Sequence, residues 1–260
     1  MKTSISDTKI YREAVELAVK HDWFFKNFKQ SPAYKEILEH VTQKEGEKYL
    51  QIILEDSPHY IEKMPQFREN DSLGNPSVYV YENAGLCSPT TLRYIKVASD
   101  IEKLYGNLDG ANIIEIGCGY GGQSKILMDL FPIGSYTYVD LDSVLKLVEK
   151  YMSNFTVQPE LIFLPFDKVG ETSIEYDLVI SNYSFSECTT EIQDLYIENI
   201  INKSDKGYMT CNFVSDLFRL KSYSQEDLRE RIDKNIFIEE EKPLTHKDNC
   251  ILCWDSNATN

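Results

Sequence analysis

The stretch that most limits the fold of this chain is a glycine-rich turn between a strand-like run and a helix-like run. Residues 112–116 are mostly apolar, residues 117–122 hold four glycines, and residues 123–130 have a helical pattern. Glycines at such a junction let the backbone turn sharply and let a ligand approach the main chain. The helix that follows offers free N–H groups at its start. The stretch therefore predicts a βα unit with a ligand at its turn.

Strand-like and helix-like runs keep alternating after this unit, which is typical of a doubly wound sheet. The further expected strands are 136–139, 161–164, 176–180, 207–213, 235–239 and 249–254, and the further helices are 143–152, 191–201 and 225–232. The last two strands are joined by only about ten residues, fewer than a parallel crossover needs. We therefore expect a Rossmann-like α/β fold with a mostly parallel seven-stranded sheet and an antiparallel C-terminal hairpin strand.

The first 105 residues lack this alternation and are rich in helical patterns. Ser31-Pro32 and Ser88-Pro89 each supply an N-cap residue and a first helical position. Residues 57–76 hold three prolines and predict a loop that could cover a pocket, which makes His59 a candidate substrate contact. We predict a helical cap or lid region over 1–105 and a core domain over 106–260.

Charge and hydropathy limit the classes of partner that this protein can bind. The chain of 260 residues carries 27 basic and 42 acidic side chains and a net charge of −15, so its surface would repel a nucleic-acid backbone. We find no apolar run of about 18 residues, the length that a membrane-spanning helix needs. The first residues lack the apolar core of a secretory signal. We therefore expect a cytoplasmic protein without nucleic-acid or membrane partners, and a homo-oligomer stays open.

The glycine turn fits two cofactors. Gly117, Gly119 and Gly122 satisfy GxGxxG, which is compatible with NAD or NADP. Glu115 also gives the turn an ExGxGxG form, in which an acid can accept a hydrogen bond from the cationic amino end of S-adenosylmethionine but would repel a pyrophosphate. Asp140, at the end of the next expected strand, can hold two ribose hydroxyls. Together with the terminal hairpin, these acids favour S-adenosylmethionine.

Four sequence blocks resemble the sugar O-methyltransferase family within the class I S-adenosylmethionine-dependent methyltransferases. They are residues 88–96 (SPTTLRYIK), 115–123 (EIGCGYGGQ), 177–187 (DLVISNYSFSE) and 241–249 (EKPLT, then Asn249). The resemblance implies methyl transfer to a sugar hydroxyl, on a nucleotide sugar or a surface glycan. His246 departs from the family pattern, which has glycine there, so no family role carries over to it. A methyltransferase with a non-sugar acceptor and, less favoured, an NAD(P)-dependent sugar oxidoreductase remain the alternatives.

Ligands of such sheets bind outside the carboxyl ends of the parallel strands, which selects the candidate residues. The expected cofactor contacts are Glu115, Gly117, Cys118, Gly119, Gly121, Asp140, Leu141, Asn182 and Tyr183. Glu187 is the candidate general base, with a helix N-terminal charge as the competing interpretation, and His246 is a second candidate placed by topology. The expected substrate contacts are His59, Arg93, Tyr94 and Ser186. Because no carboxylates and histidines cluster at ligand spacing, we predict no metal.

Overall fold

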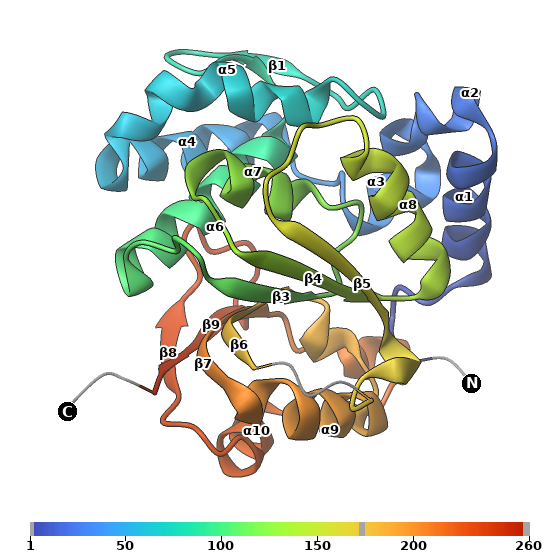
Figure 1. The fold of residues 1–260 in the computed structure, drawn as a ribbon, viewed down its shortest axis with the longest axis vertical. Coiled ribbons are helices and arrows are strands. Elements are labelled where there is room, and N and C mark those ends of the chain that lie inside the picture. Colours follow the sequence, from blue (N-terminus) through green and yellow to red (C-terminus); the bar gives the residue numbers. More distant parts are fainter. Residues whose placement is uncertain (1–2, 172–174, 257–260) are drawn as a thin grey trace.

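The computed structural model describes residues 3–171 and 175–256, with one seven-stranded sheet running through the centre (Figure 1). The strand order is β5-β4-β3-β6-β7-β9-β8. The strands are β3 (Asn112–Ile116), β4 (Ser135–Asp140), β5 (Glu160–Pro165), β6 (Tyr176–Asn182), β7 (Ser204–Cys211), β8 (Phe237–Glu240) and β9 (Cys250–Asp255).

Pairing within this sheet confirms the predicted fold class. Strands β5, β4, β3, β6 and β7 run parallel, whereas β9 lies antiparallel between β7 and β8. The strand order reverses at β3, which has β4 on one side and β6 on the other. In open α/β sheets the crevice at such a reversal is where ligands bind.

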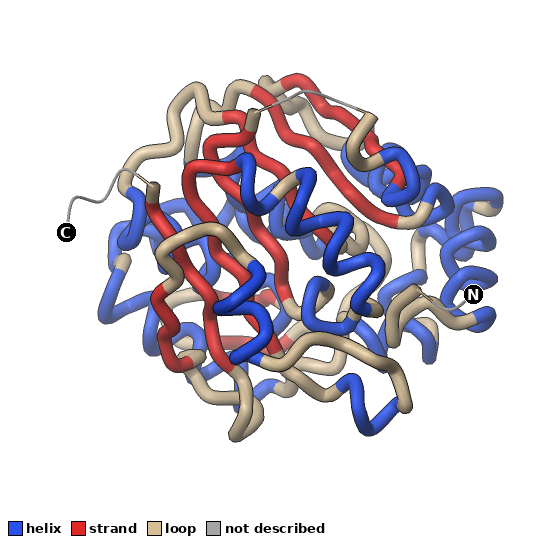
Figure 2. Tube along the Cα trace, turned by 90° about the horizontal axis from the view of Figure 1, so that it is seen from below, coloured by secondary structure: helices blue, strands red, loops and turns tan. Residues whose placement is uncertain are grey.

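Helices cover both faces of the sheet, as Figures 1 and 2 show. One face carries α6 (Pro89–Tyr105), α7 (Gly122–Leu130) and α8 (Asp142–Met152); the other carries α9 (Thr190–Asn199) and α10 (Gln225–Arg231). Side chains alternate along β3, so Ile113 joins the core under the first face and Ile114 the core under the second. Single 3-10 turns occur at η4 (Phe166–Lys168), η5 (Phe185–Glu187), η6 (Ile201–Lys203) and η7 (Ser215–Phe218).

The chain before α6 forms a helical layer over the face that carries α7 and α8 (Figure 1). Its helices begin at side-chain caps such as Thr8, Ser31 and Thr42, each of which accepts a backbone N–H of the first turn. The elements are α1 (Lys9–Lys20), α2 (Asp22–Phe25), η1 (Phe28–Gln30), α3 (Pro32–Ile37), α4 (Gln43–Asp56), η2 (Pro58–Lys63), α5 (Met64–Phe67), η3 (Arg68–Asp71) and the hairpin β1 (Tyr79–Tyr81) with β2 (Gly85–Cys87).

The prediction of a loop over residues 57–76 is wrong for most of its length, because η2, α5 and η3 follow one another through Asp71. Pro58 and Pro65 each stand in the first turn of a helical segment. A proline there loses no intrahelical hydrogen bond, so these prolines begin helical turns instead of interrupting them.

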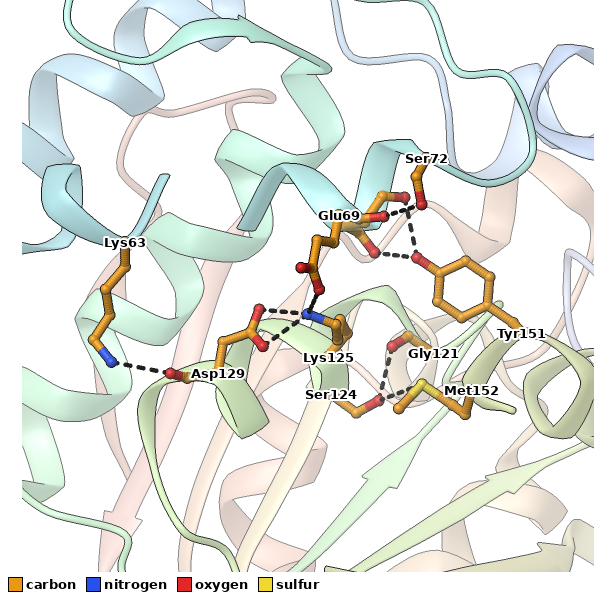
Figure 3. Close-up of polar contacts among 10 residues, drawn as sticks. Lys63, Glu69, Ser72, Gly121, Ser124, Lys125, Asp129, Tyr151 and Met152 are labelled. Carbon is orange, nitrogen blue, oxygen red and sulfur yellow. Dashed lines mark hydrogen bonds and ion pairs between the residues drawn. The ribbon is translucent and has the colours of Figure 1, made fainter. Parts of the chain in front are cut away.

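Polar contacts join the helical layer to the core behind the glycine turn (Figure 3). Lys125 of α7 lies 2.7 Å from Asp129 and 3.2 Å from Glu69 of η3. The Tyr151 hydroxyl of α8 donates to Asn70, at 2.5 Å from its side-chain oxygen and 3.0 Å from its carbonyl. Lys125, Asn70 and Tyr151 are buried, whereas the Glu69 side chain is 58% exposed. The contacts of η3 with α7 and α8 therefore depend mainly on the buried Asn70–Tyr151 pair. None of the helices in the described ranges is both long and apolar enough to cross a membrane.

Candidate functional site

A cavity of about 370 Å³ lies at the carboxyl ends of β3, β4 and β6. Its size falls within the range of small-molecule sites, roughly 300–1,000 Å³. The glycine turn, the end of β4, the turn after β6 and the loop 241–249 contribute to its lining, as do α4, α6 and the N-terminal residues 3–6. The cavity thus occupies the place at which the strand order reverses.

The glycine turn enters the cavity with a backbone that only glycine adopts easily. Gly117, Gly119 and Gly121 have φ angles of +76°, +57° and +91°. A Cβ atom on Gly117 would lie 2.0 Å from the Ser184 Oγ, so a side chain there would collide with the turn after β6. Gly117, Cys118 and Gly119 all line the cavity, as predicted for cofactor contacts.

Glu115 lines the cavity from β3 and is only 2% exposed. Its Oε2 accepts a hydrogen bond of 2.9 Å from the Tyr136 hydroxyl, and burial raises the pKa of the carboxyl to about 8. Among the described residues it has no ion-pair partner. A buried carboxyl with one oxygen committed to a phenol suits a cationic or hydrogen-donating group of a ligand.

Asp140 ends β4 and lines the cavity together with Leu141. Its Oδ1 accepts from the Leu141 N–H at 2.8 Å, and its Oδ2 lies 3.7 Å from the Cys118 Sγ. Burial raises the pKa of Asp140 to about 6, although the N–H groups of Leu141 and Gly119 act in the opposite direction. The carboxylate is therefore fixed by its own turn and can accept from a pair of hydroxyls.

Asn182 and Tyr183 bring the end of β6 into the same cavity. The Asn182 Oδ1 is buried without a hydrogen-bond partner. The Tyr183 hydroxyl donates to Glu241, which also accepts from Thr245 and Asn249 in the loop 241–249. The loop between β8 and β9 therefore holds the Tyr183 ring in place.

Glu187, the candidate base, lines the cavity from η5. Its Oε1 accepts from the Asn212 Nδ2 at 2.6 Å, and burial raises the pKa of its carboxyl. The N-cap of the next helix is Thr189, two residues later. Glu187 therefore lies in the cavity lining and also just ahead of α9, so its position is compatible with both interpretations.

His246, Arg93 and Tyr94 also line the cavity. The His246 side chain is about half exposed and lies 3.9 Å from Asp248 within the loop 241–249. Arg93 and Tyr94, on the first turns of α6, are buried, with the Tyr94 ring 5.6 Å from the Arg93 guanidinium carbon. These three residues bring α6 and the β8–β9 loop into the lining of the cavity.

Three predicted contacts are absent from the described lining. His59 lies on η2, where its ring is 3.5 Å from Glu102 and its side chain is 61% exposed, because the expected covering loop is a helical segment on the far side of α6. The buried Ser186 hydroxyl donates to the Tyr183 carbonyl and so braces the turn. Gly121 is the N-cap of α7 and packs against Val148 and Met152.

The sequence patterns missed the N-terminal segment of residues 3–6. Thr3, Ser4 and Ser6 line the cavity, and Ser4 forms an antiparallel bridge with Cys188. The Ile5 N–H donates to the Glu187 carbonyl at 3.0 Å, and the Thr189 N–H donates to the Thr3 carbonyl at 2.9 Å. No periodicity or motif in so short a segment points to this pairing.

Two other missed residues follow from the strand-end rule. Phe166 comes directly after β5 and Asn212 directly after β7, and both line the cavity. Applying that rule to every strand would have found them. No group of three or more His, Cys, Asp or Glu that could hold a metal ion occurs among residues 3–171 and 175–256.

Comparisons with known proteins agree with this architecture. No family model matches the chain. The chain is 38% identical over 90 residues to the malonyl-[acyl-carrier protein] O-methyltransferase of Priestia megaterium, a match that spans 32% of this chain and 31% of that relative.

Two solved structures share the fold. An S-adenosylmethionine-dependent methyltransferase from Clostridium acetobutylicum has a TM-score of 0.51 and 11% identity, covering 64% of this chain and 92% of its own. The PH0226 protein from Pyrococcus horikoshii has a TM-score of 0.50 and 12% identity, covering 63% and 89%. The chain therefore has the fold of the class I S-adenosylmethionine-dependent methyltransferases.

Proposed function

We propose that this protein is an S-adenosylmethionine-dependent O-methyltransferase and that its acceptor is a hydroxyl group of a sugar. One observation carries the proposal: a single cavity holds the glycine turn, the buried carboxyl of Glu115 and the partly buried carboxyl of Asp140 on the neighbouring strands β3 and β4, and a third carboxyl, that of Glu187, after β6. The two solved structures support the fold on which the proposal depends, and the partial relative is itself an O-methyltransferase by name.

The residues present fit S-adenosylmethionine. Glu115 would accept from the amino group of its amino-acid end, and a cation there would offset the cost of ionising this buried carboxyl. Asp140 would accept from the ribose hydroxyls. Asn182, with its buried Oδ1 unpartnered, would take a donor from the same ligand. When bound, the cofactor supplies a methyl group activated by the charge on its sulfur.

Glu187 would take the proton of the acceptor hydroxyl. A neutral alcohol is a weak nucleophile, and a base within hydrogen-bond reach assists its attack. Burial raises the pKa of Glu187, which strengthens it as a base, and Asn212 orients its Oε1. The other oxygen remains for the acceptor. Positioning the hydroxyl in line with the methyl group is the remaining task of the cavity.

A sugar acceptor is supported by the four sequence blocks that resemble the sugar O-methyltransferases and by further polar groups in the lining of the cavity. Tyr49, Tyr183, Thr245 and His246 lie there, and the Asn249 Oδ1 is buried without a partner. Tyrosine rings can stack on the faces of a sugar, and amide groups can form hydrogen bonds with its hydroxyls. A non-sugar acceptor is the second candidate, favoured by the 38% identity over 90 residues to an enzyme named for an acyl-carrier-protein substrate.

The test is transfer of a labelled methyl group from S-adenosylmethionine to a panel of sugars, nucleotide sugars and malonyl thioesters. We expect label in a sugar-containing product. The Glu187→Gln variant should lower kcat by about 10²-fold or more while leaving S-adenosylhomocysteine affinity within about twofold, an affinity change below 0.5 kcal/mol. The matched control is Glu191→Gln, which changes an exposed glutamate four residues after Glu187. Label found only in the thioester would show that the acceptor is not a sugar. An unchanged kcat in Glu187→Gln would show that Glu187 is not the base.

A further inference from the structure

We infer that Arg93 forms an anion subsite in the cavity, which binds a carboxylate or phosphate group carried by the acceptor. The inference rests on the proposed methyltransferase function and narrows its acceptor to an acidic molecule, such as a uronic acid or a sugar phosphate. It starts from an unusual feature: a buried guanidinium that faces the cavity and has almost no partner within the described protein.

Arg93 is only 7% exposed, yet the arginines that form ion pairs among the described residues are Arg12 and Arg231, and Arg93 is not one of them. Its Nη2 donates to the Leu38 carbonyl at 3.2 Å, and its Nε is buried with no hydrogen-bond partner. A guanidinium has five N–H donors arranged to match a carboxylate or phosphate in two parallel bonds. Because burying a charge without a counter-ion is costly, the arrangement is that of a site completed by an anion.

Arg93 also places a positive charge among the acidic side chains that line the cavity. The described lining of the cavity contains the carboxyl groups of Glu45, Glu115, Asp140 and Glu187, and Arg93 is the one arginine or lysine in it. An anion that enters this cavity would be repelled by the ionised acids of the lining and attracted by the Arg93 guanidinium. Such a charge pattern selects acidic acceptors by orientation as well as by affinity.

The position of Arg93 favours the acceptor over the cofactor as the source of the anion. Arg93 lines the cavity together with Tyr49 and Tyr183. Tyr49 comes from α4, which packs along α6 (Figure 1), and Tyr183 is bonded to the β8–β9 loop. These elements lie outside the βα units that form the glycine turn and Asp140, so they bound the end of the cavity left for the acceptor.

Glu39 is the competing partner. One of its oxygens accepts from the Thr90 hydroxyl at 3.0 Å, and the other is buried without a partner. Burial raises the pKa of its carboxyl, which favours the neutral acid. If Arg93 existed only to pair with Glu39, replacing it would destabilise the fold. If Arg93 awaits a ligand anion, removing its uncompensated charge should leave thermal stability unchanged or raise it.

The experiment is a calorimetric titration of the protein loaded with S-adenosylhomocysteine, using three probes that share a ring: glucose, glucuronate and glucose 6-phosphate. We expect at least one anionic probe to bind at least tenfold more tightly than glucose. Arg93→Gln should abolish this preference, and Arg93→Lys, which keeps the charge but loses the planar fork, should restore only part of it. Arg231→Gln, an exposed arginine paired with Asp194, is the matched control and should behave as the wild type.

The loading step separates the two hypotheses. Failure of the wild type to bind S-adenosylhomocysteine would overturn the proposed function, whereas normal loading with no preference for either anionic probe would overturn the anion subsite alone. Two results in Arg93→Gln would also overturn it. One is a tenfold loss of S-adenosylhomocysteine affinity with no loss for 5′-methylthioadenosine, which lacks the carboxylate. This result would mean that Arg93 binds the carboxylate of the cofactor. The other is a lowered melting temperature reproduced by Glu39→Gln, which would make Arg93 a structural partner.

Discussion

At the residue scale, burial without a counter-charge distinguishes the cavity acids. Glu115 and Asp140 have pKa values raised to about 8 and about 6, so at neutral pH a large fraction of Glu115 is protonated in the free protein. The ordinary pKa of a glutamate is 4.5. Folding therefore loses stability from Glu115 as the pH rises from about 4.5 to about 8, because the unfolded chain ionises the group and the folded chain resists it.

The first prediction follows from this shift. A cationic amino group of S-adenosylhomocysteine would bind the ionised form of Glu115, so binding should release a proton, and affinity should rise between pH 6.5 and 8, by up to about tenfold per pH unit. Calorimetry in buffers of different ionisation heat measures both effects. In Glu115→Gln the dependence over this range should vanish, and the variant should be more heat-stable than the wild type above pH 8. An identical pH dependence in the variant would contradict the role of Glu115.

A second residue-scale prediction concerns Gly117. Gly117 and Gly110 have similar φ angles, +76° and +74°, but a Cβ on Gly117 would meet Ser184 whereas one on Gly110 would meet open space. We expect Gly110→Ala to cost about 1–2 kcal/mol from backbone strain alone and Gly117→Ala to cost clearly more. Adding Ser184→Gly to Gly117→Ala should recover part of the difference. Chemical denaturation measures all three, and equal losses for the two glycines would refute the steric argument.

At the element scale, strand ends and the glycine turn were predictable, whereas the elements that close the cavity were not. The ends of β3, β4 and β6 follow from apolar runs and the turn that succeeds them, since a parallel strand is continuously apolar and ends where polar residues begin. The N-terminal segment pairs with the turn after β6 through backbone atoms, which leave no signature in side-chain patterns. A different reason explains why η2 was missed and His59 misplaced: Pro58 stands in the first turn of η2, where a proline begins a helical turn and does not mark a loop.

The third prediction tests the N-terminal segment. Ile5→Pro removes the N–H that donates to the Glu187 carbonyl. Ile5→Ala keeps this N–H, and both variants lose the isoleucine side chain. Because Thr3, Ser4 and Ser6 line the cavity on either side of Ile5, loosening this segment should speed ligand escape. We expect S-adenosylhomocysteine to dissociate severalfold faster from Ile5→Pro than from Ile5→Ala, with similar melting temperatures. Stopped-flow displacement measures this, and equal rates would mean that the segment does not retain the ligand.

At the scale of the whole molecule, the helical layer and the sheet share one buried core. The aromatic ring of Phe28 from the layer packs with Tyr34 beside it and with Tyr120 and Tyr151 from the core. The boundary predicted between residues 105 and 106 falls directly after α6. A composition shift marks where the alternation begins, but it does not reveal whether the two parts pack together, because packing depends on side chains far apart in the chain.

The fourth prediction follows from that shared core. Heat unfolding should show a single transition. Tyr151→Phe leaves the buried Asn70 Oδ1 without its donor, whereas the Asn70 carbonyl keeps the Lys29 ammonium. We expect the change to destabilise the protein by about 1–3 kcal/mol without splitting the transition. Tyr79→Phe, on an exposed tyrosine of β1, is the control. Two separate transitions in calorimetry would show that the layer and the sheet unfold independently.

The most direct test of the central claim is a calorimetric titration of the purified protein with S-adenosylhomocysteine, with NAD and NADP in parallel. We predict saturable binding of S-adenosylhomocysteine alone, weakened at least about tenfold, or 1.4 kcal/mol, in Asp140→Ala. Asp142→Ala, an exposed acid two residues later that pairs with Lys146, should bind as the wild type does. Binding of NAD or NADP instead, or S-adenosylhomocysteine binding that is unaffected by Asp140→Ala, would contradict the account of this cavity.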